Sequence, residues 1–116
     1  MASNTPVLIL TTNDCPGYTV QEIIGPVFGI SVRSRNAVGN MLGNLSQSFG
    51  GEQKGYIKLA SDARDSAIEQ LTQAARTLGA NAVLAMRFDS DQLGNEKGTA
   101  LNEVVAYGTA VVLAGL

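Results

Sequence analysis

The sequence contains no histidine and only one cysteine, Cys15, among its 116 residues. Without histidine, the chain cannot build a Ser-His-Asp or Cys-His nucleophile system, or a metal site with an imidazole ligand. With one cysteine, no disulfide can form within the chain, and a lone thiol is typical of a reducing compartment. A general base would have to be a carboxylate, a lysine, a tyrosine or this thiol.

Positive charge is also scarce. Eight Lys and Arg residues stand against ten Asp and Glu, for a formal net charge of −2. This balance lacks the basic clusters that nucleic-acid binding requires, so no nucleic-acid partner is expected. The longest nearly apolar run, residues 104–116, has 13 residues, whereas a membrane span needs roughly 20. The first residues lack the basic and apolar regions of a signal peptide. We therefore expect a cytoplasmic protein with no membrane partner.

Four segments rich in β-branched residues predict strands over residues 7–12, 19–33, 82–91 and 102–113. Gly25-Pro26 interrupts the second segment. Because proline cannot donate to a strand ladder, a bend, a bulge or a sheet edge is expected there. The polar link between the last two segments predicts a wide antiparallel hairpin.

Two segments have helical periodicity instead. Residues 36–49 predict a short helix, with Asn36 as N-cap and Gly50-Gly51 as its stop. A longer helix is predicted up to Gly79, with a buried stripe at Tyr56, Ala60, Ala63, Ala67, Leu71, Ala74 and Leu78. The expected fold class is α+β: a small antiparallel sheet packed on one long helix plus a short helix, in one domain over residues 1–116.

The predicted strands are apolar on both sides, although successive strand side chains point to opposite faces. Residues 82–89 place Ala82, Leu84, Met86 and Phe88 on one face and Val83, Ala85, Arg87 and Asp89 on the other. One long helix can cover only one face, and each Val or Leu left in water forfeits roughly 1.5–3 kcal/mol. We expect other subunits to cover the second face. The alternative is a monomer in which the short helix folds over it.

Asp89, Asp91 and Gly94 match the first, third and sixth positions of a calcium-binding loop. Leu93 at the fifth position and Ala100 at the twelfth do not match, because the twelfth should be a bidentate glutamate. A polar hairpin link is the better interpretation. Weak binding of a hard cation stays open for three carboxylates: Asp89, Asp91 and Glu96.

Cys15 is the one soft metal ligand, in the turn-like stretch "NDCPGY". No neighbouring Lys or Arg in the sequence would activate its thiol, and a soft metal usually needs several Cys or His ligands. An inert turn cysteine is favoured, although symmetry in an oligomer would bring copies together. Around Ser31, "GISVR" lacks the closing glycine of a nucleophile elbow.

Four blocks, "EIIGPVFG", "SRNAVGNMLGNLSQSFGGEQKGY", "ARTLGANAVLAMRFD" and "YGTAVVL", resemble the YbjQ family, also called UPF0145, in order and over residues 7–113. The resemblance implies a dodecin-like subunit in a homopentameric ring, whose neighbours would cover the second side of residues 82–89. The family carries a heavy-metal-binding label, which implies a metal ion of unknown identity. No ligand motif of the family can be carried onto residues of this chain.

Three functions follow as expectations. The first is a homo-oligomer that binds a metal or a small ligand at symmetric sites, with Cys15, Asp89 and Asp91 as candidate metal ligands. The second is an enzyme with a carboxylate base in a cleft between subunits, at Asp89, Asp91 or Glu103. The third is a scaffold that presents a ring surface to a partner protein. The sequence contains no catalytic motif that favours the enzyme.

Overall fold

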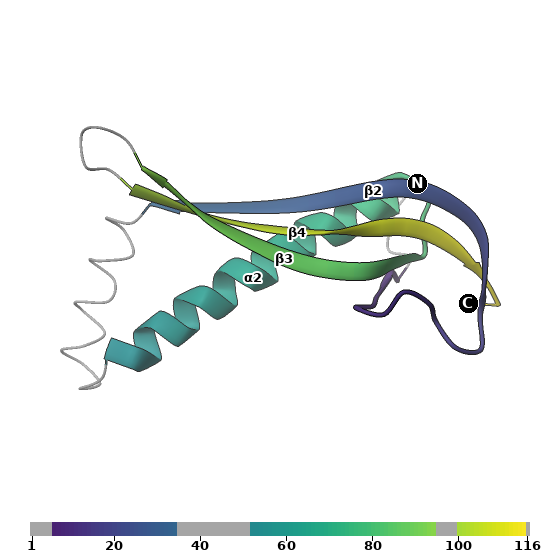
Figure 1. Cartoon of the computed structure of the whole chain (residues 1–116), viewed down its shortest axis with the longest axis horizontal. Coiled ribbons are helices and arrows are strands. Elements are labelled where there is room, and N and C mark those ends of the chain that lie inside the picture. Colours follow the sequence, from purple (N-terminus) through teal and green to yellow (C-terminus); the bar gives the residue numbers. More distant parts are fainter. Residues whose placement is uncertain (1–5, 35–51, 95–99, 116) are drawn as a thin grey trace.

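The computed structural model describes residues 6–34, 52–94 and 100–115. In these ranges a four-stranded sheet packs against one long helix (Figure 1). The elements in chain order are β1 (Leu8–Ile9), β2 (Thr19–Ser34), α2 (Glu52–Thr77), β3 (Ala82–Gly94) and β4 (Ala100–Ala114). The α+β class is confirmed. The short helix predicted over residues 36–49 lies outside the described residues.

The sheet has the strand order β1-β3-β4-β2. β3 and β4 form the predicted antiparallel hairpin, and β2 pairs antiparallel with the other side of β4. β1 pairs parallel with β3, so the sheet is mixed rather than purely antiparallel. The first strand is also shorter than residues 7–12, because only Leu8 and Ile9 pair with β3 as a strand.

The predicted irregularity at Gly25-Pro26 is confirmed. β2 is an edge strand, and its register with β4 shifts between Val20 and Glu22 and again between Ile23 and Gly25. Gly25 has a φ of 140°, which favours glycine. An edge position and a bulge are the two places where a strand tolerates proline.

Helix α2 ends at Thr77, and Gly79, the predicted stop residue, follows in the turn with a φ of 88°. The amide of Gly79 donates to the Arg76 carbonyl and the amide of Ala80 donates to the Ala75 carbonyl, each at 3.0 Å. This pair of bonds is the Schellman motif, which satisfies two of the free carbonyls at a helix C-terminus. The chain can therefore turn directly from α2 into β3.

The buried stripe of α2 differs from the predicted one at its ends. The buried residues step by four and are Ala63, Ala67, Leu71 and Ala75. Ala60 is exposed, and Leu78 is 53% exposed in the turn after the helix. The helix crosses the strands obliquely (Figure 1), and an oblique contact follows the inclined row of every fourth residue.

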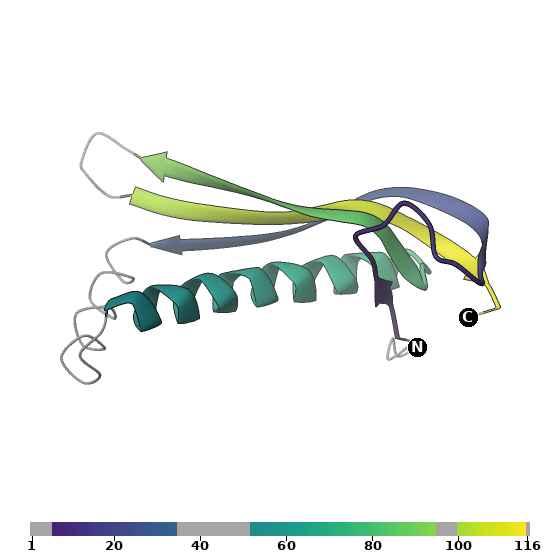
Figure 2. The ribbon, with the colours of Figure 1, turned by 60° about the horizontal axis from the view of Figure 1, so that its bottom comes forward.

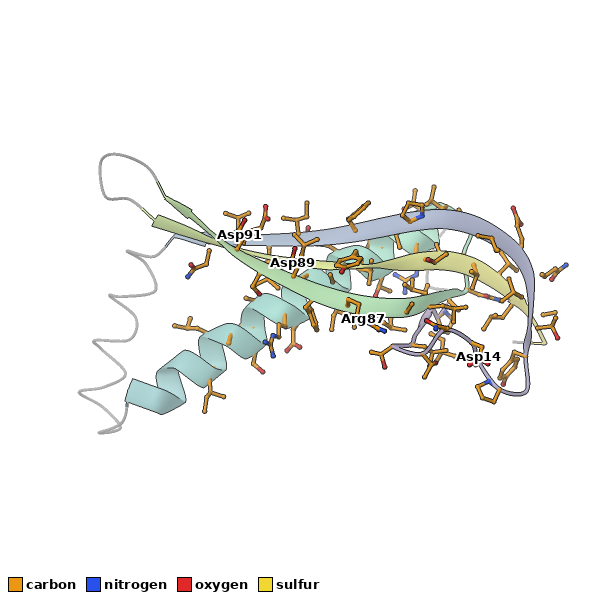
Figure 3. All side chains as sticks on the ribbon, in the orientation of Figure 1. Asp14, Arg87, Asp89 and Asp91 are labelled. Carbon is orange, nitrogen blue, oxygen red and sulfur yellow. The ribbon has the colours of Figure 1, made fainter. Side chains whose placement is uncertain are left out.

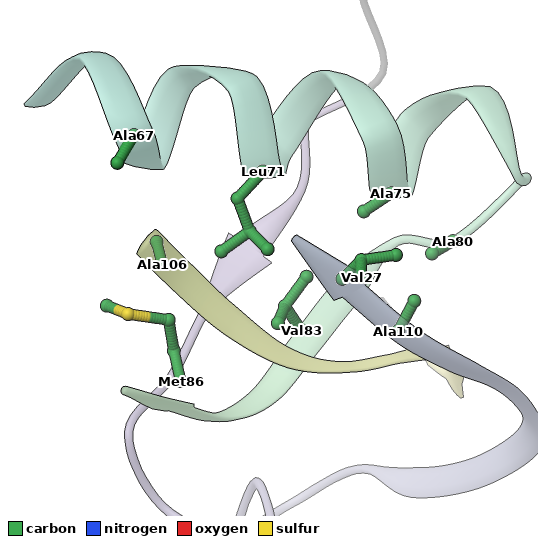
Figure 4. Close-up of a cluster of buried hydrophobic side chains, with 9 residues drawn as sticks. All are labelled: Val27, Ala67, Leu71, Ala75, Ala80, Val83, Met86, Ala106 and Ala110. Carbon is green, nitrogen blue, oxygen red and sulfur yellow. The ribbon is translucent and has the colours of Figure 1, made fainter. Parts of the chain in front are cut away.

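Small residues let the helix approach the sheet closely. A Cβ added to Gly29 in β2 would overlap the Ala67 carbonyl oxygen and the Leu71 amide nitrogen. The core beneath the helix is a cluster of nine residues (Figure 4): Val27, Ala67, Leu71, Ala75, Ala80, Val83, Met86, Ala106 and Ala110. The alanines on the buried face of α2 thus pack against small residues of the sheet, which include Gly29, Ala106 and Ala110.

A β-bulge in β3 changes the predicted face assignment. The register with β4 shifts between Leu84 and Arg87, and Ala85 has a φ of 56°. Val83 and Met86, three residues apart, therefore both face α2. The prediction that Ala82, Leu84, Met86 and Phe88 share one face is wrong, because one extra residue reverses the alternation beyond it.

Part of the second face is covered by the chain itself. Ala82, Leu84, Val111 and Leu113 form a second buried cluster on the side away from α2, and Leu10 and Cys15 pack against it. The amide of Ala85 donates to the Thr12 carbonyl at 2.8 Å, and that of Met86 donates to the Leu10 carbonyl at 2.9 Å. The segment between β1 and β2 thus replaces the strand pairing that the bulge interrupts.

Candidate functional site

The far face is the side of the sheet that does not contact α2 (Figure 2). The segment between β1 and β2 (residues 10–18, called the N-terminal segment below) covers part of this face. Elsewhere on the face, β2 and β4 expose an apolar band. We define this band by its exposed side chains, which are Phe28, Ile30, Val32 and Tyr107. Strand pairing sets Phe28 opposite Tyr107 and Ile30 opposite Val105. Between Ile23 and Val32, β2 contains no charged residue.

The apolar band matters because its members are large and contiguous. Phe28 is 54% exposed and Tyr107 is 39% exposed, although their rings are neighbours. Large contiguous apolar patches on soluble proteins usually mark association surfaces or ligand sites. Among the described residues, the part of the second face formed by β2 and β4 exposes apolar side chains. The expectation that other subunits cover this face stays a prediction, and the alternative cover, the short helix, lies outside the described residues.

The other half of the far face is charged. Beyond the bulge, every second residue of β3 lies on the far face, and these residues are Arg87, Asp89 and Asp91 (Figure 3). Strand pairing sets Asp91 opposite Glu103. Nη1 of Arg87 donates to the Thr11 carbonyl at 2.8 Å and to the Met86 carbonyl at 2.9 Å. Arg87 therefore anchors the N-terminal segment. All three β3 side chains are exposed.

The candidate metal ligands that the structure describes, Cys15, Asp89 and Asp91, do not converge within the chain, and Glu96 lies outside the described residues. Asp14, which precedes Cys15, lies near the opposite end of the sheet from Asp91 (Figure 3). Across residues 6–34, 52–94 and 100–115, no three Cys, Asp or Glu side chains are placed to hold a metal ion. Asp89 and Asp91 lie in paired positions of β3, not in a loop that could wrap a cation. One chain thus provides one thiol and no imidazole, a donor set that does not fit a soft heavy metal.

The structure also places the candidate nucleophile, Ser31, and the candidate general bases, Asp89, Asp91 and Glu103. Ser31 lies within β2 with its side chain buried on the α2 side, so it cannot act as an exposed nucleophile. Asp89 and Asp91 are exposed, and Glu103 is half-buried. A carboxylate that acts as a general base usually lies in a cleft that holds the substrate beside it, and the strand surface around Asp89 and Asp91 is open.

A hollow of about 290 Å³ opens on the far face beside the bulge. Its floor is Thr109 and Val111 of β4, and its walls come from β2 and β3. Asn13 of the N-terminal segment closes one end. No pattern in the sequence predicts this hollow. Gly25-Pro26 predicts the irregularity in β2 on one side of the hollow, but nothing near Ala85 in the sequence indicates the bulge in β3 on the other side.

These features define a small α+β fold with one covered and one partly open sheet face, and comparisons with known proteins identify its family. A family model described as "Putative heavy-metal-binding" (YbjQ) matches residues 7–114. The UPF0145 protein of Acidiphilium cryptum is 50% identical over 107 residues, 92% of this chain and 94% of that protein. The UPF0145 protein TV0671 of Thermoplasma volcanium is 47% identical over 107 residues, 92% of this chain and 84% of that protein. The chain therefore belongs to the YbjQ (UPF0145) family.

One solved structure has a similar fold. It is a protein of unknown function of the DUF74 family from Pediococcus pentosaceus, with a TM-score of 0.55 and 14% sequence identity. The match covers 92% of this chain and 97% of that chain. At this identity the likeness concerns the fold alone. The dodecin-like ring implied by the resemblance stays a prediction. Among the described residues, no helix combines the length and hydrophobicity needed to cross a membrane.

Proposed function

We propose that this chain is the subunit of a cytoplasmic homo-oligomeric ring that binds a small ligand or a metal ion at sites repeated around the ring. The apolar band formed by Phe28, Ile30, Val32 and Tyr107 carries the proposal. Full burial of a large apolar side chain contributes roughly 1.5–3 kcal/mol, and these side chains are about half exposed, so a neighbour that covers them gains about 1 kcal/mol for each. A pentamer is the ring size that the family resemblance implies.

The division of the far face supports packing between copies of the chain. The apolar band runs along the edge strand β2, whereas the charges of Arg87, Asp89 and Asp91 run along β3. One face thus offers an apolar core and a polar rim, the arrangement found in specific interfaces. A ring closes when each subunit contacts its two neighbours through two different surfaces.

Of the two ligand classes, the residues favour a small molecule. A soft metal would need Cys15 thiolates from several subunits, and Cys15 packs against the buried cluster of Ala82, Leu84, Val111 and Leu113. A hard cation would need Asp89, Asp91 and Glu103 to be joined by oxygen ligands from a neighbour.

Native mass spectrometry tests the assembly and the ligand class together. Apo protein should give a homo-oligomer, with a pentamer at about five times 12.1 kDa. Zinc, copper and calcium are then added separately, to the native protein and to the Cys15→Ser and Asp89→Asn/Asp91→Asn variants. If a metal is the ligand, one of these variants loses stoichiometric binding while the oligomer persists. A protein that stays monomeric would overturn the proposal.

The scaffold and enzyme alternatives have separate signatures. A scaffold would be an oligomer that binds no small ligand and purifies with a partner protein. An enzyme would lose turnover, but not assembly, in Glu103→Gln or Asp89→Asn. The pairing of Asp91 with Glu103 on the open face is the observation that keeps the enzyme as the second candidate.

A further inference from the structure

The hollow on the far face lies where both neighbours of β4 are irregular. Thr109 pairs with Pro26 of β2 and Leu84 of β3, and Val111 pairs with Ile23 and Ala82. The register of β2 shifts just beyond Ile23, and that of β3 shifts just beyond Leu84. Bulges bend a strand and increase its local twist, and they are frequent beside binding sites. Here two bulges flank the same short stretch of the central strand.

The walls of the hollow are apolar. Val20 and Ile23 line it from β2, and Leu84 and Ala85 line it from β3. Ile23 is 72% exposed, the largest exposed fraction among the described large apolar side chains. An occupant of the hollow would remove this side chain from water and gain its hydrophobic free energy. The observation therefore favours an apolar occupant.

The polar groups at the hollow are few and uncharged. They are the Thr109 hydroxyl on the floor and the Asn13 amide at one end. No Asp, Glu, Lys or Arg is among the lining residues. A charged ligand would lose hydration here without gaining an ionic partner among the lining residues, which opposes its binding. A neutral ligand with one hydrogen-bonding group matches the lining.

The size of the hollow limits the ligand further. Pockets for drug-sized molecules span roughly 300–1,000 Å³, and the volume of about 290 Å³ falls just below that range. The hollow therefore accommodates about one ring rather than two.

The backbone at the hollow is held in an unfavourable conformation. Ala85 is the one non-glycine residue with positive φ among the described residues, at 56°. Such residues are energetically unfavourable and persist where the surroundings fix them. Here the Thr12 carbonyl accepts the Ala85 amide at 2.8 Å. Strain held by a specific contact at a hollow is typical of a preformed site.

From these observations we infer that the hollow between the two bulges binds a small neutral molecule of about one ring, with its polar group toward Thr109 or Asn13. This inference rests on the proposed ligand-binding function and names the site and the ligand class within it. It does not depend on the ring size. The hollow is formed within one subunit, so the two claims fail separately.

Methyl-detected NMR of the full chain in its native assembly tests the site. The probes are benzyl alcohol, toluene and benzoate, which share one ring and differ in their polar group. Benzyl alcohol should shift the methyl signals of Ile23, Val111 and Ala85 in a saturable manner. Toluene should bind about fivefold more weakly, since it lacks one hydrogen bond. Benzoate should bind more weakly still because the site has no cation.

Two kinds of variant separate the site from general hydrophobic binding. Thr109→Val keeps the side-chain shape and removes the hydroxyl, so it should abolish the preference for benzyl alcohol over toluene if the ring's polar group points there. Asn13→Ala should abolish this preference instead if the polar group of the ligand points toward Asn13. Val20→Trp fills the hollow from a half-exposed wall and should weaken binding at least about tenfold.

The outcomes are exclusive. Shifts centred on the methyl groups of Ile30 and Val32 would place binding on the apolar band and overturn the inference. No saturable shift in an intact oligomer would mean that a neighbouring subunit fills the hollow, or that nothing binds there, and would also overturn it. Binding by a monomeric protein would support the inference and refute the ring.

Discussion

Phe28 and Tyr107 lie opposite each other in adjacent strands, with their ring centroids 6.5 Å apart and their planes inclined by 33°. This separation is within the range of a favourable aromatic pair. Both rings lie on the face away from α2 and both remain exposed. An aromatic pair that stays exposed to water is the strongest sign that this face meets another surface.

Substitution of Phe28 by glutamate should weaken subunit association. Removing one large apolar side chain from an interface costs about 2 kcal/mol, or about a thirtyfold change in the association constant. Sedimentation velocity over a dilution series measures the change. Ile57→Glu is the matched control, because Ile57 is 68% exposed on α2, away from the far face. Equal effects of the two substitutions would argue against the apolar band as the interface.

The corrected stripe of α2 predicts which leucine stabilises the fold. Leu71→Ala should lower the free energy of unfolding by about 2–5 kcal/mol, because Leu71 is fully buried in the core. Leu78→Ala should cost less than about 1 kcal/mol, since that side chain is half exposed. Urea denaturation of the two variants gives both values. A larger loss for Leu78→Ala would restore the stripe predicted from periodicity.

Two glycine substitutions separate steric crowding from backbone strain. Gly29→Ala should cost about 3 kcal/mol, because the added methyl overlaps the backbone of α2 at Ala67 and Leu71. Gly79→Ala should cost only about 1 kcal/mol, since it meets no atom and only opposes the positive φ. Thermal unfolding of both variants at one protein concentration provides the comparison. A Gly29→Ala protein as stable as the parent would show that α2 does not sit so close to β2.

Relief of the strain at Ala85 should stabilise the protein. Ala85→Gly permits a φ of 56° without the Cβ penalty, so the unfolding free energy should rise by up to about 1 kcal/mol in urea denaturation. Ala82→Gly is the control, because Ala82 is fully buried in a regular part of β3 and its loss should destabilise. A destabilised Ala85→Gly would mean that Ala85 does not carry strain.

The sequence predicted the elements well where the determinants are local. The stop at Gly79 needs only the αL conformation of one residue, and the disruption at Gly25-Pro26 needs only the missing amide of proline. The bulge at Ala85 was missed because its cause is distant. The carbonyls of Leu10 and Thr12 fix it, and both belong to the N-terminal segment, far from Ala85 in the chain.

The candidate site was less predictable for the same reason. Asp89 and Asp91 were identified by their spacing, but the bulge decides that they lie on the far face rather than beneath α2. Cys15 was correctly predicted to lie in a turn, since the Tyr18 amide donates to its carbonyl at 3.1 Å. Its packing over Leu84 and Val111 depends on the path of the N-terminal segment, which no local pattern encodes.

The mass of the native protein in solution tests the central claim most directly. Sedimentation velocity at micromolar subunit concentration should show one species at a multiple of 12.1 kDa, with a pentamer as the expected form. A single well-folded species at 12.1 kDa would contradict the account, because the apolar band would then be stable in water.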